Sequence, residues 1–378
     1  MTEQRTEQRT EQRTEQRTDS TTPAARQARR DLATRGAHRL CVAPMMDWTD
    51  RHCRALHRLF GERIVLYTEM ITASALLHGD APRLLAHDPC EHPLALQLGG
   101  SEPDDLARAA TLGVRAGFDE LNLNIGCPSD RVASGSFGAC LMAEPERVAN
   151  CVAAMKDAVN DAMTTSAGRR VPVTVKCRLG IDGRDCAGLD SDSHLAHFVD
   201  TVASAGCALF IVHARKAILG GLSPKENREI PPLQYERVHA LARRRPDLEI
   251  ILNGGLTDPS ACAAQLGLVD GVMIGREAYH NPMMLLATVR ALAGDTTPAP
   301  DDPLPILQRY LPYVEAELAA GEPLSRITRH LLGIFHGRPG ARAFRRHLSE
   351  HAHRRGADVG VLLEAIDRAR AAGAARAA

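Results

Sequence analysis

The chain has 378 residues, of which 44% are hydrophobic, and its 46 Lys and Arg residues balance its 46 Asp and Glu residues. This length allows a large hydrophobic core and exceeds the usual size of one compact domain, so we expect one large domain with a small appendage. The zero net charge excludes a uniformly basic or acidic protein, and any polyanion-binding surface must therefore be local.

Cysteine usage and hydropathy indicate the compartment. The ten cysteines include no C-x-x-C pair, and no signal peptide or long apolar run precedes them. We therefore expect reduced thiols in a cytoplasmic protein. No stretch approaches the ~18 uninterrupted apolar residues of a membrane span. We expect a monomer without a membrane segment or a structural metal.

The first 36 residues are rich in polar and small residues and contain a short repeat. Residues 2–17 are four copies of Thr-Glu-Gln-Arg, and the residues that follow, up to about Arg35, are mostly polar or small. Such a segment offers no apolar face to bury, so we predict a disordered tail over residues 1–36.

From Leu40 onward, short apolar runs suited to buried parallel strands alternate with amphipathic segments suited to helices. Eight such strands joined by helices, over about 250 residues, are typical of an α/β protein with a (β/α)8 TIM barrel rather than an open doubly wound sheet. We assign residues 37–300 to this barrel. The strands are expected at 40–44, 63–69, 93–98, 119–124, 171–177, 208–213, 248–253 and 270–274. Two of the connecting helices are expected at 103–117 and 145–159, because both segments begin with Pro followed by acidic residues.

The strand signal stops after about Pro300, and residues 301–378 predict a small all-helical C-terminal domain. Apolar residues at helical spacing place its helices at 303–318, 325–335, 341–353 and 358–372. Between Arg326 and Arg355 there are eight Arg, five His and only one acidic residue, Glu350. This local basic patch is suited to a polyphosphate partner such as RNA.

In a parallel barrel the chemistry gathers at the carboxyl ends of the strands. The first strand is followed by Pro44, Met45 and Met46, a stiff, polarisable segment that can lie against a flat ring system, although Met also fills ordinary cores. The third strand ends near Gln97, whose amide can both donate and accept, as pairing to an isoalloxazine or pyrimidine edge requires.

The fourth strand carries the most informative motif, Leu-Asn-Leu-Asn-Ile-Gly-Cys-Pro over residues 121–128. Asn124 at the strand end, a glycine for a close turn and a cysteine held by Pro128 present the thiol of Cys127 at the barrel mouth. Most other cysteines are expected to be small buried hydrophobes.

The remaining strand ends suggest an anionic ligand with a phosphate. Lys176 at the end of a buried strand requires an anionic partner, which a reduced flavin would provide. His213 lies at the same rim and is expected to contact the ligand. In the alternative, its ring nitrogens are hydrogen-bonded to other protein groups and it supports the site without contacting the ligand. Loops after strands seven and eight commonly bind phosphate in this fold, and here they contain Asn253, Gly254, Gly255, Gly275 and Arg276.

Taken together, these segments closely resemble the tRNA-dihydrouridine synthases, in particular their A-type branch. The resemblance extends from Leu40 to about Gly360 and includes, in the order of the family, APMMDWTDRHCR, YTEM, LQLGG, LNLNIGCPS, VKCRLGID, VHARKA, LSPKENREIPPL, NGG and MIGR. Leu219-Gly220-Gly221, which precedes the LSPKENREIPPL segment, is a small departure from the family pattern, and the Thr-Glu-Gln-Arg tail has no counterpart there.

The resemblance implies FMN as the cofactor, NADPH as its reductant and the tRNA D-loop, at positions 20 and 20a, as the substrate. In the mechanism it implies, the flavin passes a hydride to C6 of uridine while Cys127 donates a proton to C5. The residues implied to hold FMN are Pro44, Met45, Met46, Gln97, Lys176, His213, Asn253, Gly254, Gly255, Gly275 and Arg276. Those implied to contact tRNA are Asn124, Lys225, Arg228, Arg342 and Arg345.

Two alternative functions remain open from the residues. A dihydroorotate dehydrogenase-like flavoenzyme that reduces a free pyrimidine would use the same barrel and Cys127, but it has no use for the basic C-terminal helices. A non-catalytic RNA-binding protein would use those helices, but it would not need the complete set of Cys127, Lys176 and His213.

Overall fold

The computed structural model describes residues 36–129, 137–163, 170–183 and 186–377. The predicted tail up to Arg35 lies outside these residues, as do Gly135 and Ser136 of the loop that follows Cys127.

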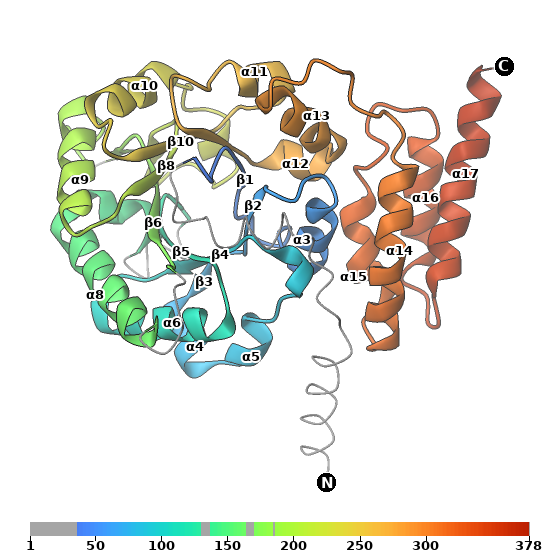
Figure 1. Cartoon of the computed structure of the whole chain (residues 1–378), viewed down its shortest axis with the longest axis horizontal. Helices are drawn as coiled ribbons and strands as arrows, with labels where there is room; N and C mark the ends of the chain where they lie inside the picture. Colours follow the sequence, from blue (N-terminus) through green and yellow to red (C-terminus); the bar gives the residue numbers. More distant parts are fainter. Residues whose placement is uncertain (1–35, 130–136, 164–169, 184–185, 378) are drawn as a thin grey trace, which may run out of the picture.

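Among the described residues, eight parallel strands close into a ring that is surrounded by helices (Figure 1). Neighbouring strands pair in the order β1-β2-β4-β5-β6-β8-β10-β11, and β11 pairs with β1 to close the barrel. The ring strands are β1 (Leu40–Val42), β2 (Val65–Tyr67), β4 (Leu94–Gly99), β5 (Glu120–Ile125), β6 (Val173–Arg178), β8 (Leu209–His213), β10 (Glu249–Asn253) and β11 (Gly271–Ile274). The predicted TIM barrel is thus confirmed.

Each predicted strand overlaps one ring strand, and the ends differ by a few residues. The prediction for the first strand ran to Pro44, whereas β1 ends at Val42. Ala43 still donates its N–H to the Ile274 carbonyl at 2.8 Å. Pro44 has no N–H with which to continue the ladder. Three short strands lie outside the ring: β3 (Ile71–Thr72) extends the sheet beside β4, and β7 (Ile181–Asp182) pairs with β9 (Ala217–Ile218).

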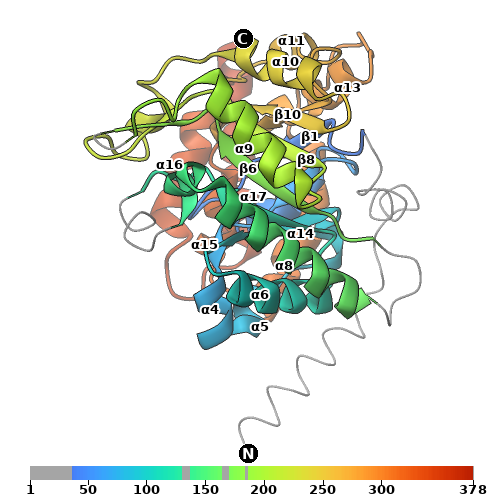
Figure 2. The same ribbon diagram turned by 90° about the vertical axis from the view of Figure 1, so that its left-hand side faces the viewer.

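Helices cover the outside of the ring, and α6, α8 and α9 lie next to one another there (Figure 2). The barrel helices are α3 (Arg51–Arg58), α4 (Ala73–His78), α5 (Ala81–Leu84), α6 (Pro103–Ala116), α8 (Pro145–Met163), α9 (Asp192–Ser204), α10 (Tyr235–Arg244), α11 (Pro259–Ala263), α12 (Arg276–His280) and α13 (Met283–Leu292). Short 3-10 turns are η1 (Pro89–Glu91), η2 (Gly138–Ala143) and η3 (Glu226–Arg228).

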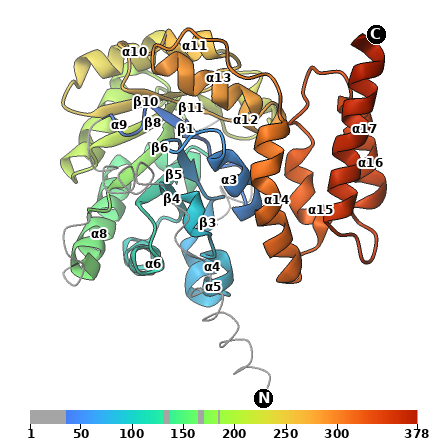
Figure 3. The ribbon, with the colours of Figure 1, turned by 45° about the vertical axis from the view of Figure 1, so that its right-hand side comes forward.

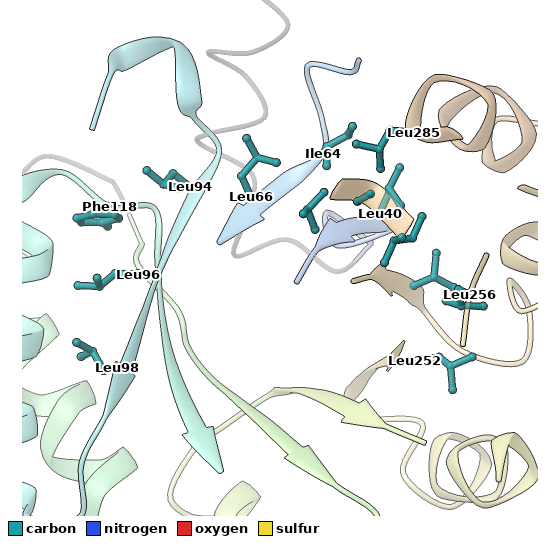
Figure 4. Close-up of a cluster of buried hydrophobic side chains, with 14 of the residues drawn as sticks. Leu40, Ile64, Leu66, Leu94, Leu96, Leu98, Phe118, Leu252, Leu256 and Leu285 are labelled. Carbon is teal, nitrogen blue, oxygen red and sulfur yellow. The ribbon is translucent and has the colours of Figure 1, made fainter. Parts of the chain in front are cut away.

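The core follows the alternation of side chains along each strand. Leu94, Leu96 and Leu98 of β4 belong to the large apolar cluster shared with the surrounding helices (Figure 4). Ala95, between two of them, belongs to a small second cluster with Cys41 and residues of other ring strands. The strands are therefore covered on both faces, as parallel sheets require.

A buried polar cluster lies near the amino ends of the strands. The His38 Nε2 lies 2.6 Å from a carboxylate oxygen of Glu120, the first residue of β5. The Tyr67 hydroxyl donates to the other Glu120 oxygen at 2.8 Å. Burial opposes a charge on His38, but Glu120 and Glu249 outweigh it and raise the pKa of His38 to about 9. His38 and Glu120 thus form a buried ion pair at the end of the barrel opposite the strand carboxyl ends.

The C-terminal region is helical and lies beside the barrel (Figure 3). It contains α14 (Leu304–Ala319), α15 (Leu324–Thr328), the 3-10 turn η4 (Arg329–Leu331), α16 (Ala341–His351) and α17 (Val359–Ala377). Its contacts with α3 include an ion pair between Arg51 and Glu317 at 2.8 Å and a hydrogen bond from the Tyr310 hydroxyl to the His52 carbonyl at 2.9 Å.

The predicted helix over 325–335 is shorter than expected. The α-helix ends at Thr328 and tightens into η4, which ends at Leu331. A Cβ atom at Gly333 would lie 2.5 Å from the His280 carbonyl oxygen. The backbone at Gly333 therefore packs directly against the carbonyls of Tyr279 and His280 in the barrel, where no side chain fits. This tertiary contact has no signal in the local periodicity.

All ten cysteines are free thiols. Within the described residues no helix combines the length and hydropathy that crossing a bilayer demands.

Candidate active site

The predicted site residues of the ring strands meet at one rim, because all eight strands run parallel. The strand register places Asn124 opposite Lys176, and His213 opposite both Arg178 and Asn253. Gln97 lies on β4, next to β5. Segments separated by more than a hundred residues in sequence therefore contribute to one end of the barrel.

A chain of hydrogen-bonded side chains runs from this rim into the barrel. The Asn124 Nδ2 donates to Gln97 Oε1 at 2.8 Å, and the Gln97 Nε2 donates to Asn122 Oδ1 at 2.8 Å. Asn122 then donates to Thr174, whose hydroxyl donates to Glu120. Because each amide is held at both ends, the orientation of Gln97 is fixed before any ligand binds.

Cys127 lies on a loop that Asn124 holds in place. The Asn124 Oδ1 accepts the backbone N–H groups of both Gly126 and Cys127, each at 3.0 Å. Ala139 donates its N–H to the Cys127 carbonyl at 3.0 Å. The thiol itself is only partly buried and lies 3.5 Å from the Ser129 hydroxyl. The loop thus presents the sulfur on a backbone that is fixed from both sides.

The rim carries excess positive charge. Burial, and then the charge of Arg178, lower the pKa of Lys176 to about 8. Burial followed by Arg178 and Lys176 depresses the pKa of His213 well below its usual value, so the imidazole is neutral near pH 7. Arg178 is bonded to the Cys127 loop, because its Nε donates to the Gly126 carbonyl at 3.0 Å. A negative charge on Cys127 would also favour the charged forms of Lys176 and Arg228.

Neither Lys176 nor Arg178 forms an ion pair with a carboxylate in the described part of the chain. A buried cation without a counterion is costly unless a ligand compensates it. This charge arrangement fits an anionic cofactor whose negative charge lies beside Lys176.

Two glycines after β10 have positive φ angles and pack closely against neighbouring side chains. A Cβ atom on Gly254 (φ +113°) would lie 2.6 Å from the His213 ring. One on Gly255 (φ +69°) would lie 2.3 Å from Leu233. Asn253 links β10 to the neighbouring strand by donating to the Met273 carbonyl at 2.8 Å. Both glycine positions therefore accept only glycine, because neighbouring side chains occupy the space that a Cβ atom would need.

Gly275 precedes α12, and Arg276 is the first residue of that helix. The Arg276 Nη1 lies 2.5 Å from a carboxylate oxygen of Glu229, and both side chains are partly exposed. An ion pair this exposed is weak because water screens it, so a phosphate can replace the carboxylate.

The segment after β1 differs from ordinary core. Pro44 and Met45 are half-buried, whereas the Met46 side chain is 58% exposed. Of the two methionines that could have been core filler, Met45 packs against the main apolar cluster, whereas Met46 does not. Arg329 of the C-terminal region donates to the Asp47 carbonyl at 2.9 Å, and His330 lies 3.0 Å from a carboxylate oxygen of Asp50. The C-terminal region thus contacts this loop directly.

The other predicted tRNA contacts fall in two places. Lys225 and Arg228 are exposed at η3, and Arg228 lies close to Cys127 and Arg276. Arg342 and Arg345 lie on α16, where they line a cavity of about 1040 Å³ with residues of α17. The structure therefore does not bring Arg342 and Arg345 to the barrel mouth with the other predicted residues.

Ion pairing distinguishes the arginines that line this cavity. Arg338 pairs with Asp301, Arg346 with Glu350, and Arg368 with Glu364. In the described structure, no carboxylate forms an ion pair with Arg342 or Arg345. These two side chains therefore retain uncompensated charge for an external anion.

Sequence reasoning missed Arg178. It belongs to the motif VKCRLG but was given no role, and it is 3% exposed beside Cys127. The sequence did contain a signal for Arg178, because a charged residue at the end of a buried strand indicates a role in the site. Only the nearby Lys176 was assigned such a role on this basis.

The chain matches the dihydrouridine synthase (Dus) family over residues 41–371. A tRNA-dihydrouridine(20/20a) synthase from Xanthomonas axonopodis pv. citri is 53% identical over 331 residues, which cover 87% of this chain and 93% of that protein. Proteins of the same name from Shewanella oneidensis and Salmonella typhimurium are 54% and 52% identical, over 85% and 87% of this chain and 91% and 95% of their own lengths. Among solved structures, morphinone reductase aligns with a TM-score of 0.43 and 15% identity over 71% of this chain and 88% of its own. The match over residues 41–371, together with relatives more than half identical, shows that the chain belongs to the dihydrouridine synthase family.

Proposed function

We propose that this protein reduces the C5–C6 double bond of uridine in the tRNA D-loop, at positions 20 and 20a, using FMN with NADPH as the reductant. The proposal is supported by family membership and by relatives named tRNA-dihydrouridine(20/20a) synthase. The observation that carries it is a partly exposed thiol, Cys127, held on a fixed loop beside the uncompensated cation of Lys176. We further propose that the protein acts as a cytoplasmic monomer.

In this proposal residues 37–300 bind the cofactor. FMN, when bound, supplies the hydride that NADPH has given to it. Lys176 compensates the negative charge of the reduced ring, and the neutral His213 contacts the ligand. Gln97, fixed by Asn122 and Asn124, retains one N–H and one lone pair for the ring edge. The residues that would hold its phosphate are Asn253, Gly254, Gly255, Gly275 and Arg276, and those that would contact its ring are Pro44, Met45 and Met46.

Cys127 donates the proton to C5 of uridine. A thiol carries an ionisable proton and can therefore serve as a general acid. Once the proton has left, the negative charge on the sulfur lies near Lys176, Arg178 and Arg228. These fixed cations stabilise that charge without reorganising. Asn124 orients the base through its remaining amide hydrogen.

We assign residues 301–378 to tRNA binding, together with the η3 segment. Lys225 and Arg228 contact the RNA close to the reacting base, and Arg342 and Arg345 contact its backbone farther away. The target base must leave its stack to reach Cys127, and a D-loop nucleotide does so at a lower cost than a base-paired one. Two separated contacts then recognise the shape of the RNA rather than its sequence.

The test is turnover on defined substrates. Purified protein with FMN and NADPH should convert an unmodified tRNA transcript to dihydrouridine at positions 20 and 20a, mapped by mass spectrometry of nuclease fragments. Reduction of free uracil, or oxidation of dihydroorotate, in the absence of activity on tRNA would instead support a small-molecule flavoenzyme. Colourless protein that binds tRNA but produces no dihydrouridine would support the non-catalytic alternative.

A further inference from the structure

Arg178 joins three segments of the site that are far apart in sequence. It is the last residue of β6, and its Nε donates to the Gly126 carbonyl at 3.0 Å. Its Nη1 donates to the carbonyls of Lys216 at 3.1 Å and Asn227 at 2.9 Å. Gly126 immediately precedes Cys127, and Asn227 lies between Lys225 and Arg228. One guanidinium thus connects the proton-donor loop to the segment proposed to contact RNA.

The chemistry of the guanidinium explains why an arginine is needed here. Burial, opposed by the charge of Cys127, lowers the pKa of Arg178 to about 10, so the group remains charged at neutral pH. Its planar head carries five N–H donors in a fixed arrangement, whereas a lysine ammonium has three on a single nitrogen. Holding three carbonyls that converge from different directions requires the planar head.

The RNA-contact segment is itself rigid. Asn227 is fully buried, and its Nδ2 donates to the carbonyls of Ile218 at 3.0 Å and Leu222 at 3.2 Å. Its Oδ1 accepts the Ile218 N–H at 2.8 Å. These bonds close the segment from 218 to 227 into one unit. Any displacement of this unit is therefore transmitted to Arg178 through the Asn227 carbonyl.

We propose that Arg178 is a positioning residue that fixes the Cys127 loop relative to the RNA-contact segment, so that docking of tRNA on Lys225 and Arg228 sets the distance between Cys127 and the base. This inference rests on the proposed function. Arg178 sets the position of the loop through backbone carbonyls, in addition to the effect of its charge, and it is not a proton donor. Arg178→Lys retains the positive charge, so this variant tests position rather than charge. A misplacement of about 1 Å at a reacting group is enough to cost about 100-fold in rate.

Arg58 provides a matched control at the other end of the barrel. Arg58 is also buried, and its guanidinium also donates hydrogen bonds to backbone carbonyls: those of Gly61 and Ile64 at 2.7 Å and that of Glu91 at 2.9 Å. Its pKa is likewise lowered to about 10, chiefly by burial. Arg58→Lys therefore imposes a comparable structural change away from the site.

The experiment compares Arg178→Lys with Arg58→Lys in the full-length FMN-loaded enzyme. For Arg178→Lys we expect kcat for dihydrouridine formation to fall about 100-fold, while NADPH still reduces the flavin at the wild-type rate. Hydrogen exchange of the amides at 124–127 and 226–228 should increase together. Arg58→Lys should lower the melting temperature and leave both the exchange at these amides and kcat near wild type. Equal losses of kcat in the two variants, in proportion to their melting temperatures, would overturn the proposal, as would wild-type kcat in Arg178→Lys.

A second variant keeps the test decisive if Arg178→Lys does not fold. Asn227→Ala loosens the RNA-contact segment without touching the Cys127 loop. It should nevertheless increase hydrogen exchange at Cys127, and unchanged exchange there would refute the connection through Arg178. Because exchange is measured without turnover, it remains informative even if the wild-type protein forms no dihydrouridine, an outcome that would contradict the proposed function alone.

Discussion

The side chains of Asn124 and Gln97 are hydrogen-bonded to each other at 2.8 Å, with Asn124 as the donor. Asn124 at the same time accepts the backbone N–H groups of Gly126 and Cys127. Asn124, which is predicted to contact the base, therefore lies between Gln97, which is predicted to contact the flavin, and the loop that carries Cys127. Its carboxamide oxygen is engaged by this loop, so only one amide hydrogen remains for a ligand.

Two substitutions at Asn124 should separate its two roles. Asn124→Ala removes the acceptor for the Cys127 loop, so dihydrouridine formation should fall by two to four orders of magnitude, about the contribution of a well-placed acid. Asn124→Asp retains the acceptor and loses the donor to Gln97, so a smaller loss is expected. Single-turnover rates of dihydrouridine formation with pre-reduced enzyme measure the loss in each variant. Equal losses in the two variants would argue against the loop-holding role.

Replacing Cys127 by Ala should leave yellow, FMN-loaded protein that NADPH reduces normally but that forms almost no dihydrouridine. The expected loss is about 100- to 10,000-fold, because a proton donor is removed and the flavin site is not. Stopped-flow absorbance follows flavin reduction, and mass spectrometry follows the product. Cys140→Ala is the matched control, since Cys140 is also half-buried and its thiol donates only to the Phe137 carbonyl. Normal turnover by Cys127→Ala would remove Cys127 from the acid role.

Lys176 should make FMN binding depend on pH. Its pKa of about 8 in the free protein means that the ammonium is charged below this pH and loses its charge above it. The dissociation constant of FMN should therefore rise as the pH increases through about 8. Lys176→Met should weaken binding by about 2 kcal/mol at pH 7, roughly 30-fold, and should abolish this pH dependence.

Quenching of flavin fluorescence provides the dissociation constants for this test. Lys156→Met is the control, because Lys156 lies on α8 outside the ring and donates to the Ala205 carbonyl at 3.4 Å. A pH profile of Lys176→Met that matches the wild type would show that another group titrates.

Arg342 and Arg345 should contribute to tRNA affinity through charge. Replacing both by Ala should weaken binding and lower the slope of log K against log salt by about 2, one for each phosphate that is no longer neutralised. Fluorescence anisotropy with labelled tRNA at several salt concentrations measures the slope. Arg346→Ala is the matched control on the same helix, because Glu350 already compensates Arg346 at 2.8 Å. Affinity of the double variant equal to wild type at every salt concentration would contradict the assignment.

His38 should make stability depend on pH. Its pKa is raised from 6.5 to about 9 in the folded protein, so the unfolded chain releases this proton at a lower pH than the folded chain. The stabilisation is fully present below about pH 6.5 and is lost as the pH rises through about 9. The total amounts to about 3 kcal/mol.

Melting temperatures of wild type and His38→Asn between pH 6 and 10 test this. The variant should be less stable at pH 6, because Glu120 and Glu249 lose their buried partner, and the difference from wild type should shrink toward pH 10. A difference that stays constant over the whole range would show that His38 is not charged in the folded state.

The sequence by itself determined the barrel, its eight strands and the rim at which Gln97, Asn124, Lys176, His213 and Asn253 meet. These features follow from local patterns: apolar runs specify buried parallel strands, and parallel strands end at the same face. Only the tertiary structure decided which side chains form hydrogen bonds with which groups. The bonds of Arg178 to Gly126 and Asn227, the bond between Asn124 and Gln97, and the separation of Arg342 from the barrel mouth depend on strand register and on the paths of long loops. Such contacts join residues far apart in the chain, and no periodicity within a short window encodes them.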